Sequence, residues 1–261
     1  MILDEIIRHK KKEIASSKKA RSLALLESKT RRLGRRANRF LSSLKKGRGM
    51  AVIAEIKRRS PSKGVLRRDF DPAAIARDYQ RSGARALSVL TDRKYFGGSE
   101  KVLRRVKKAS SLPVLRKDFI VDEYQVHESR LMGADAILLI ARVLDRTLLR
   151  RLHALAGKLG LEVLFEVHDR ADLKKVLPLK PRLVGVNNRD LSNFRVDLGV
   201  TRRLAGRIPA RCLLVSESGI SKPEDVTTLK KCGVRAVLVG ETFMKDKRPG
   251  EALKRLLGKR S

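Results

Sequence analysis

The chain has 261 residues, of which 42% are hydrophobic and 34% charged, so it can bury a core and is not disordered throughout. No apolar run approaches the roughly 18 residues that a membrane span needs, and the mixed charges at its start do not resemble a signal peptide. We therefore expect a cytoplasmic protein with no membrane association. Lysine and arginine number 62 against 28 acids, and the net charge of +34 predicts attraction to anions.

Residues 1–48 lack a strong apolar run and carry basic clusters at 9–12 and 29–36. We expect a helical extension with loops, outside the core. From about residue 49 the sequence changes to short apolar runs separated by charged stretches of helical length. The predicted division is therefore an N-terminal helical extension over 1–48 and a catalytic domain over 49–261.

Eight apolar runs recur in the second part and predict strands that are buried on both faces, as in a parallel sheet covered by helices. Their number and spacing favour an α/β fold, a single closed (β/α)8 TIM barrel. Glycines at 83, 133 and 233 precede three of the runs, where a left-handed helix end is expected. The runs are AVIAEI (51–56), RALSVL (85–90), PVLRKD (113–118), DAILLI (135–140), EVLFEV (162–167), RLVGVN (182–187), CLLVSE (212–217) and RAVLVG (235–240).

An open dinucleotide-binding fold is less compatible with the first strand. Such a fold carries a G-x-G-x-x-G turn there, and the segment IAEIKRRSPSKG (53–64) does not contain it.

Polar residues interrupt the apolar runs at their ends, where barrel enzymes place their catalytic groups. Glu55 and Lys57 lie on one side of the first strand, because side chains alternate with a period of two. Any one of these charges could form a salt bridge in the upper barrel. Lysines and carboxylates that converge on one rim shift each other's pKa values and favour acid/base chemistry. The other candidates are Lys117, Glu166, Asn187, Glu217 and Ser218.

Glycines after the last two strands indicate a phosphate site. Gly219 and Gly240 stand where many barrels bind phosphate through backbone N–H groups, although each alone could be a turn glycine. The loop at 60–64 adds hydroxyls and a cation for a second anionic group. Tyr95, Phe96 and Phe119 could form a wall for an aromatic ligand, and core packing explains them equally well. Two cysteines and four scattered histidines predict no disulfide framework and no metal site.

The chain resembles the indole-3-glycerol phosphate synthase family in motifs that occur in family order from about 50 to 245. The resemblance implies ring closure of 1-(2-carboxyphenylamino)-1-deoxyribulose 5-phosphate with loss of carbon dioxide and water, without cofactor or metal. It also implies that the extension packs near the barrel mouth. The motifs are IAEIKRRSPSKG (53–64), SVLTDRKYFGG (88–98), PVLRKDFIVDEYQV (113–126), GADAILLIARVL (133–144), LFEVH (164–168), GVNNRDL (185–191) and SESGI (216–220).

The resemblance also implies residue roles. Lys117 would protonate the ribulose carbonyl, and Lys57 would contact the substrate carboxylate and assist dehydration. Glu55 and Glu166 would act as base or electrostatic stabiliser, with the division between them open. The remaining assignments place Asn187, Ser218 and Glu217 as orienting groups, Ser60 and Arg189 at the carboxylate, Gly219, Gly240 and the backbone of Glu241 at the phosphate, and Pro61, Phe96, Phe119, Leu138 and Leu191 around the anthranilate ring.

Arg59 and Arg116 depart from the family pattern, and their charge should lower the pKa of the neighbouring lysines. Two alternatives remain. A phosphoribosylanthranilate isomerase would place a cysteine and an aspartate at the rim, but Cys212 begins its strand. A nucleic-acid-binding protein would carry a recognisable motif and more than 4% aromatic residues. We expect a monomer that binds a small phosphorylated substrate and, weakly and non-specifically, polyanions.

Overall fold

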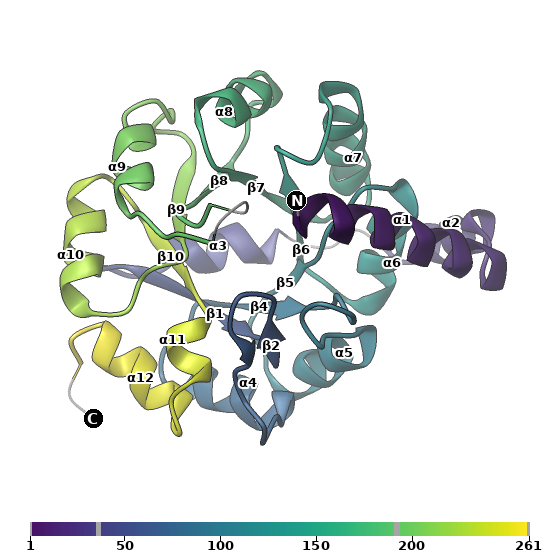
Figure 1. Ribbon diagram of the computed structural model, residues 1–261. Coiled ribbons are helices and arrows are strands. Elements are labelled where there is room, and N and C mark those ends of the chain that lie inside the picture. The colour runs from purple at the N-terminus through teal and green to yellow at the C-terminus, as the bar shows by residue number, and fades with distance from the viewer. Residues whose placement is uncertain (1, 35–37, 191–193, 260–261) are drawn as a thin grey trace.

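Eight parallel strands close into a barrel in the computed structural model, which describes residues 2–34, 38–190 and 194–259 (Figure 1). Around the barrel the strands follow the order β1-β10-β9-β8-β7-β6-β5-β4. Every predicted run forms one strand, so the predicted fold is confirmed. The bounds are β1 Ala51–Ile56, β4 Ala86–Leu90, β5 Val114–Lys117, β6 Ala136–Ile140, β7 Glu162–Val167, β8 Leu183–Asn187, β9 Leu213–Glu217 and β10 Ala236–Val239.

Helices between the strands cover the outside of the barrel (Figure 1). Gly83, Gly133 and Gly233 have φ angles of 93°, 89° and 83°, so the predicted left-handed helix ends are confirmed. Within the described residues no helix is long and apolar enough to cross a membrane. The helices are α4 Pro72–Arg81, α5 Glu100–Ala109, α6 Glu123–Met132, α7 Arg146–Lys158, α8 Arg170–Val176, η1 Leu177–Leu179, α9 Gly199–Ala205, α10 Pro223–Lys231, α11 Glu241–Met244 and α12 Pro249–Leu256.

Side-chain alternation along the strands separates two apolar layers. In β1, Val52 and Ala54 belong to the layer beneath the helices, whereas Ala51 and Ile53 belong to the barrel interior. The next interior position, Glu55, is polar and lies at the carboxyl end of the strand. The same change occurs in β5, β7, β8 and β9, so the interior is apolar at one end and polar at the other.

Helix α3 (Arg39–Lys45) packs into the apolar end of the barrel, contrary to the expectation that residues 1–48 lie outside the core. Phe40, Leu41 and Leu44 are buried among the interior residues of the strands. The Glu162 carboxylate accepts hydrogen bonds from the backbone N–H groups of Phe40 and Leu41 at 2.7 and 3.1 Å. The expectation was wrong because it weighed the basic composition of the whole segment over the apolar face of this one short helix.

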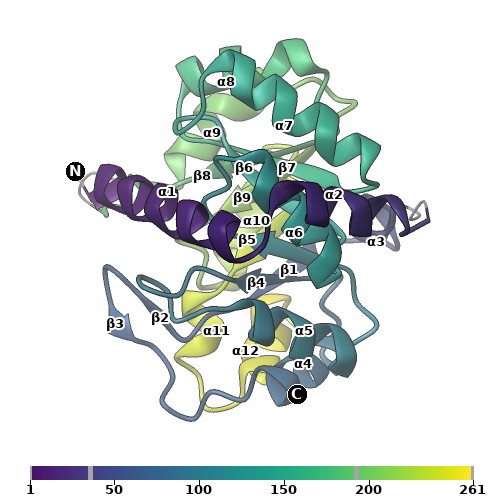
Figure 2. The same cartoon turned by 90° about the vertical axis from the view of Figure 1, so that its right-hand side faces the viewer.

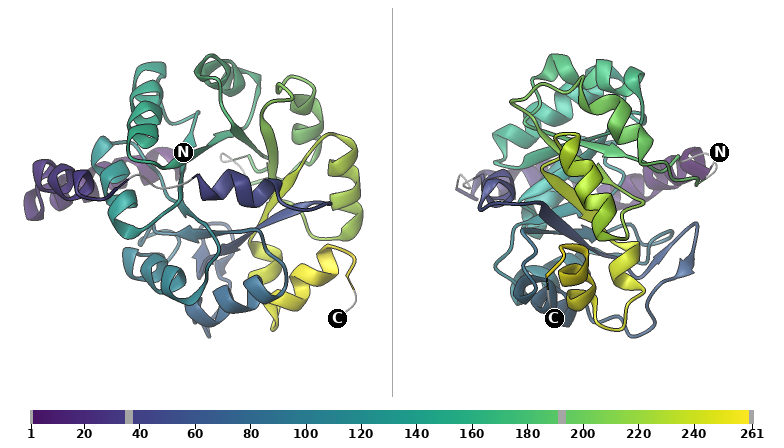
Figure 3. Two further views of the ribbon diagram at one scale, coloured as in Figure 1. Left: turned by 180° about the vertical axis from the view of Figure 1, so that it is seen from behind. Right: turned by 90° about the vertical axis from the view of Figure 1, so that its left-hand side faces the viewer.

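The rest of the extension lies beside the opposite end. Helix α1 (Ile2–Ala20) and α2 (Leu23–Arg31) run along one side of the barrel, with the N-terminal half of α1 at the end where the strands terminate (Figure 2). A small hairpin, β2 (Arg59–Ser60) and β3 (Gly64–Val65), stands at the same end. Views from behind and from the left show α3 at the far end (Figure 3). The sequence predicted this hairpin only as a loop.

Candidate active site

A cavity of about 940 Å³ opens at the carboxyl ends of the strands. It is lined by all the predicted site residues that the structure describes, whereas Leu191 lies outside the described residues. They come together because they lie on the barrel strands, toward their carboxyl ends, or in the loops that follow these strands. The lining includes Glu55, Lys57, Ser60, Pro61, Phe96, Lys117, Phe119, Leu138, Glu166, Asn187, Arg189, Glu217, Ser218, Gly219, Gly240 and Glu241.

Lys117 occupies the centre of the polar end, between two carboxylates. Its Nζ donates to Oε2 of Glu166 at 3.0 Å and to Oε2 of Glu217 at 2.5 Å. The amide nitrogen of Asn187 donates to the other oxygen of Glu166, Oε1, at 3.0 Å. Both carboxylates are almost fully buried, while the Lys117 side chain is 15% exposed toward the cavity. The ammonium is thus more exposed to the cavity than either carboxylate.

The charges around Lys117 favour its protonated form. Burial alone would lower the pKa of Lys117, but the carboxylates of Glu166, Glu217 and Glu55 outweigh burial and raise that pKa above its ordinary value. This corrects the expectation that Arg116 lowers it. Arg116 points out of the barrel, where its guanidinium donates to Thr91 and Asp118, each at 3.0 Å.

Arg59 also fails to reach the lysines. Its guanidinium donates to the backbone carbonyl oxygens of Arg93, at 3.1 Å, and Lys94. The side chain therefore links the hairpin to the loop after β4 and does not line the cavity.

Glu55, at the end of β1, and Lys57, just after it, form a second acid/base pair. The Nζ atom of Lys57 lies 2.6 Å from Oε1 of Glu55, as the period of two predicted. Gly240 makes room for this carboxylate, because a Cβ at that position would lie 2.3 Å from Oε1. Gly240 therefore has a packing reason to be glycine, in addition to any contact with a ligand.

Glu217 is the carboxylate with the most perturbed acidity. Burial, followed by repulsion from Glu166 and Glu55, raises the pKa of Glu217 to about 7 despite the opposing effect of Lys117. Burial also acts on Glu166, but Lys117 and the Asn187 amide outweigh it and lower the pKa of Glu166. The two carboxylates that share Lys117 therefore differ in acidity, and Glu217 is the one that takes up a proton at the higher pH.

We expect Glu217→Gln to flatten the pH dependence of stability. The folded chain binds this proton with a pKa of about 7 and the unfolded chain with one near 4.5, so the wild type loses stability as pH rises between these values. The variant lacks this loss, so between pH 4.5 and 8 its unfolding free energy should rise relative to that of the wild type by on the order of 3 kcal/mol. Urea unfolding at several pH values measures it. Glu224→Gln, at an exposed position of α10, is the control, and its plot of unfolding free energy against pH should be parallel to that of the wild type. A parallel plot for Glu217→Gln would refute the raised pKa of Glu217.

The loops after β8, β9 and β10 form the end of the cavity where an anionic group of a ligand would bind. Ser218 and Gly219 adopt left-handed backbone conformations with φ angles of 68° and 79°. Arg189 donates to Oε2 of Glu241 at 3.1 Å, and Lys245 donates to Oε1 of the same carboxylate at 2.7 Å. The Glu241 carboxylate thus pairs with two cationic side chains that face the cavity. A phosphate or carboxylate of a ligand would compete with Glu241 for these two side chains. Lys245 was not predicted from the sequence.

Phe96 and Phe119 form the aromatic wall, with ring centroids 6.1 Å apart. Tyr95 is not part of it, because its hydroxyl donates to Glu5 of α1 at 2.9 Å and its ring packs edge-on against His9. Sequence reasoning missed a further part of the lining. Side chains from α1 line the cavity, namely Ile2, Leu3 and Ile6.

The sequence of the chain is similar to those of known proteins over nearly its whole length. The family model described as indole-3-glycerol phosphate synthase matches residues 3–256. The indole-3-glycerol phosphate synthase of Polaromonas sp. (strain JS666) is 51% identical over 259 residues, 98% of each chain. The chain belongs to the indole-3-glycerol phosphate synthase family. That of Thermoanaerobacter pseudethanolicus is 47% identical over 94% of this chain and 93% of its own.

Solved structures show the same fold at low sequence identity. Thiamine phosphate pyrophosphorylase from Pyrococcus furiosus superposes with a TM-score of 0.59 at 15% identity, over 79% of this chain and 93% of its own. A 3-hexulose-6-phosphate synthase gives a TM-score of 0.62 at 17% identity, over 80% and 99%. These similarities concern the barrel, whereas the synthase relatives match nearly the whole chain, extension included.

Proposed function

We propose that this site closes the indole ring of 1-(2-carboxyphenylamino)-1-deoxyribulose 5-phosphate and releases indole-3-glycerol phosphate, carbon dioxide and water. The observation that supports it most is the Lys117 ammonium, held between Glu166 and Glu217 at the base of a cavity with an aromatic wall. This reaction requires a general acid, a site that binds the anionic groups of the substrate and a pocket for its aromatic ring. The chain is thus an enzyme, a carboxy-lyase of tryptophan biosynthesis.

The first step joins the ring carbon that bears the carboxylate to the ribulose carbonyl carbon. The carbonyl oxygen takes a proton from Lys117 as the new carbon–carbon bond forms. With two carboxylates as partners Lys117 is a weak acid, because they raise its pKa. When the substrate oxygen replaces one of them as the acceptor, part of that stabilisation is lost and the proton becomes easier to donate.

The positive charge that then develops on the ring and its nitrogen lies close to Glu166. Asn187 fixes this carboxylate through Oε1, so its orientation is set before the substrate arrives. Loss of carbon dioxide leaves its bonding electrons in the ring and restores aromaticity. Glu217 keeps Lys117 in place, and Ser218 orients the sugar hydroxyls.

Dehydration uses the second pair. The hydroxyl leaves as water with a proton from Lys57, and Glu55 removes a proton from the neighbouring ring carbon to complete the double bond. The two groups are 2.6 Å apart, which allows the proton to return from Glu55 to Lys57. Over the whole reaction two protons are delivered and one is removed, so each turnover consumes one proton from solvent.

The two ends of the substrate have separate partners. Ser60 and Arg189 face the carboxylate, while Gly219, Gly240 and the backbone of Glu241 bind the phosphate. Pro61, Phe96, Phe119 and Leu138 enclose the anthranilate ring, all of them lining the cavity. These assignments need no cofactor or metal.

The test is product identification. Purified chain is mixed with the carboxyphenylamino substrate, and the product is analysed by mass spectrometry together with the carbon dioxide released. We expect one carbon dioxide per molecule of indole-3-glycerol phosphate. Isomerised substrate without carbon dioxide would indicate the isomerase alternative instead.

We also propose weak, sequence-independent binding to RNA. The net charge of +34 supports it, and residues 1–48 are the most basic part, with 16 lysines and arginines against 4 acids. Exposed basic side chains of α1, such as Lys11, Lys12 and Lys19, extend this charge along the helix. Counterion release from a polyanion would provide the affinity.

We expect retention on immobilised RNA to fall steeply with salt. A plot of the logarithm of the binding constant against that of the salt concentration should be linear with a negative slope. Lys11→Gln, Lys12→Gln and Lys19→Gln combined should reduce the slope. The same number of changes in α10 and at its N-cap, at Lys222, Lys230 and Lys231, should reduce it less. Binding that is indifferent to salt would contradict this proposal.

Three further proposals concern the protein as a whole. The enzyme acts in the cytoplasm, which agrees with the free thiols of Cys212 and Cys232. It acts as a monomer, which sedimentation can measure. Residues 1–48 form an N-terminal helical extension that packs near the mouth of the catalytic barrel, residues 49–261.

A further inference from the structure

Lys10 is a buried lysine in the apolar stripe of α1. The buried residues of this helix are Leu3, Ile6, Lys10 and Ile14, whose spacing of three, four and four places them on one face. Lys10 is only 2% exposed. A lysine in such a position destabilises a fold unless charged partners compensate it.

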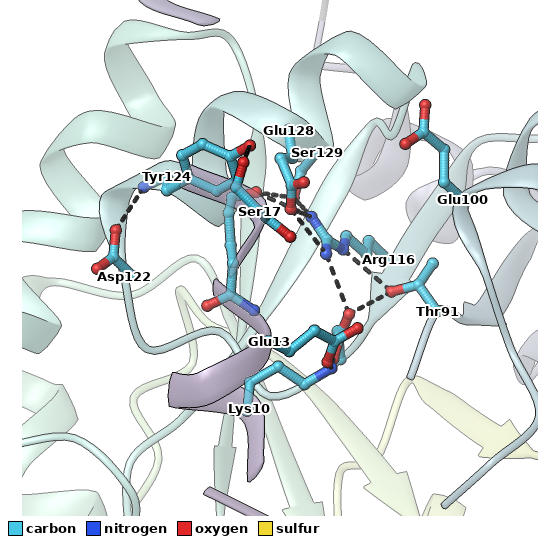
Figure 4. A network of polar contacts seen from close by, with 12 residues as sticks. Lys10, Glu13, Ser17, Thr91, Glu100, Arg116, Asp122, Tyr124, Glu128 and Ser129 are labelled. Carbon is cyan, nitrogen blue, oxygen red and sulfur yellow. Dashed lines mark hydrogen bonds and ion pairs between the residues drawn. The ribbon is translucent and has the colours of Figure 1, made fainter. Parts of the chain in front are cut away.

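Three carboxylates surround its ammonium group. The Nζ atom lies 3.0 Å from Oδ2 of Asp92, 3.0 Å from Oδ1 of Asp118 and 2.7 Å from Oε2 of Glu13. Figure 4 shows Lys10 and Glu13 on α1 next to Thr91 and Arg116 of the barrel. Burial would lower the pKa of Lys10, but Asp118 and Asp92 outweigh it and raise that pKa, so the lysine stays charged.

The two barrel aspartates begin the loops that carry the aromatic wall. Oδ1 of Asp92 accepts from the backbone N–H of Tyr95 at 2.8 Å, and the backbone oxygen of Asp92 accepts from Gly98 at 2.7 Å, which fixes the turn that holds Phe96. Oδ1 of Asp118, the residue after Lys117, accepts from the backbone N–H of Phe119 at 2.8 Å. One ammonium therefore contacts both loops.

The same helix supplies another part of the cavity wall. Ile2, Leu3 and Ile6 lie one to two turns before Lys10 and line the cavity with Phe96 and Phe119. We propose that Lys10 is a positioning residue that ties α1 to the ends of β4 and β5 and so sets the width of the pocket for the anthranilate ring. This inference rests on the proposed function, because it concerns the affinity of the same site for its substrate.

Steady-state kinetics of Lys10→Met in the full-length chain tests it. The wild type is measured in parallel, and its failure to turn over substrate would count against the proposed function, not against the role of Lys10. We expect KM to rise at least tenfold, since the two walls no longer hold their distance. We expect kcat to stay within threefold, since Lys117 keeps its contacts with Glu166 and Glu217. An unchanged KM would overturn the proposal.

Lys18→Met is the matched control. Lys18 also joins α1 to the barrel, with Nζ 2.7 Å from Oδ2 of Asp122, but the pair is about one-third exposed. Asp122 caps the N-terminus of α6 and does not line the cavity. We expect KM and kcat within twofold of wild type. A rise in KM as large as that of Lys10→Met would show that any loosening of α1 has this effect, and would overturn a specific role for Lys10.

Misfolding is distinguishable from lost positioning. A partly unfolded preparation has fewer active molecules, which lowers the apparent kcat and leaves KM unchanged. The double variant Lys10→Met with Asp92→Asn removes the ammonium together with one buried negative partner, while the asparagine oxygen can still accept from Tyr95. We expect its KM to remain at least tenfold raised. Recovery of the wild-type KM would show that the unpaired Asp92 charge, not the lost link, caused the defect.

Discussion

Lys117→Met should lower kcat by about 100- to 10,000-fold, the usual effect of removing a general acid. Methionine preserves most of the volume but cannot donate a proton to the ribulose carbonyl. The variant also leaves Glu166 and Glu217 facing each other without their shared cation. One of them is then expected to take up a proton, so the fold should persist at neutral pH. Steady-state assays of indole fluorescence measure the loss, because the chain has no tryptophan.

Lys107→Met provides a matched control for this change. Lys107 is 16% exposed and lies 2.6 Å from Oδ2 of the buried Asp135, close to the values for Lys117, but it lies outside the cavity. We expect lower stability and a kcat within twofold of wild type. Equal losses in the two variants would mean that removing any half-buried lysine disables the enzyme, and a kcat within threefold for Lys117→Met would exclude it as the acid.

Gly185→Ala should damage the active site, although Gly185 does not line the cavity. A Cβ on Gly185, in β8, would lie 2.1 Å from Oε1 of Glu217, so the carboxylate that holds Lys117 has to move. Overpacking of this kind destabilises by about 1–3 kcal/mol. A displacement of about 1 Å in a catalytic group can lower the rate roughly 100-fold. Thermal unfolding and kcat together measure both effects.

Gly157→Ala is the comparison for that substitution. Gly157 lies within α7, and nothing stands within 4 Å of the position that its Cβ would take. Alanine in a helix interior should stabilise by roughly 0.5–1 kcal/mol with unchanged kcat. If Gly185→Ala likewise leaves kcat unchanged and does not lower stability, the close approach of Gly185 to Glu217 does not matter for activity.

The barrel and the position of its polar end were predictable from the sequence. Strands buried on both faces appear as continuous apolar runs, and the period of two assigns Glu55 and Lys57 to one side. The same period sends Arg116 outward when Lys117 points inward. The expectation that Arg116 affects Lys117 failed because it used proximity along the chain instead of the face of the strand.

Other features depend on contacts between distant segments. The apolar residues of α3 form a short face within a basic segment, and nothing in their sequence shows that the far end of a barrel will cover them. Lys10 does leave a signal, a lysine in an otherwise apolar helical stripe, but its two barrel partners, Asp92 and Asp118, lie more than 80 residues away. Gly185 is an isolated glycine in a strand, a pattern that marks close approach by another group without identifying it.

The central claim is that Lys117 acts on bound substrate as the proton donor. A single-turnover experiment with enzyme in excess tests it most directly, because the rate at saturation reports the chemical step and the half-saturating enzyme concentration reports binding. For Lys117→Met we predict a saturating rate lowered at least about 100-fold and a half-saturating concentration within threefold of wild type. A wild-type saturating rate, or loss of binding that accounts for the whole defect, would contradict the claim.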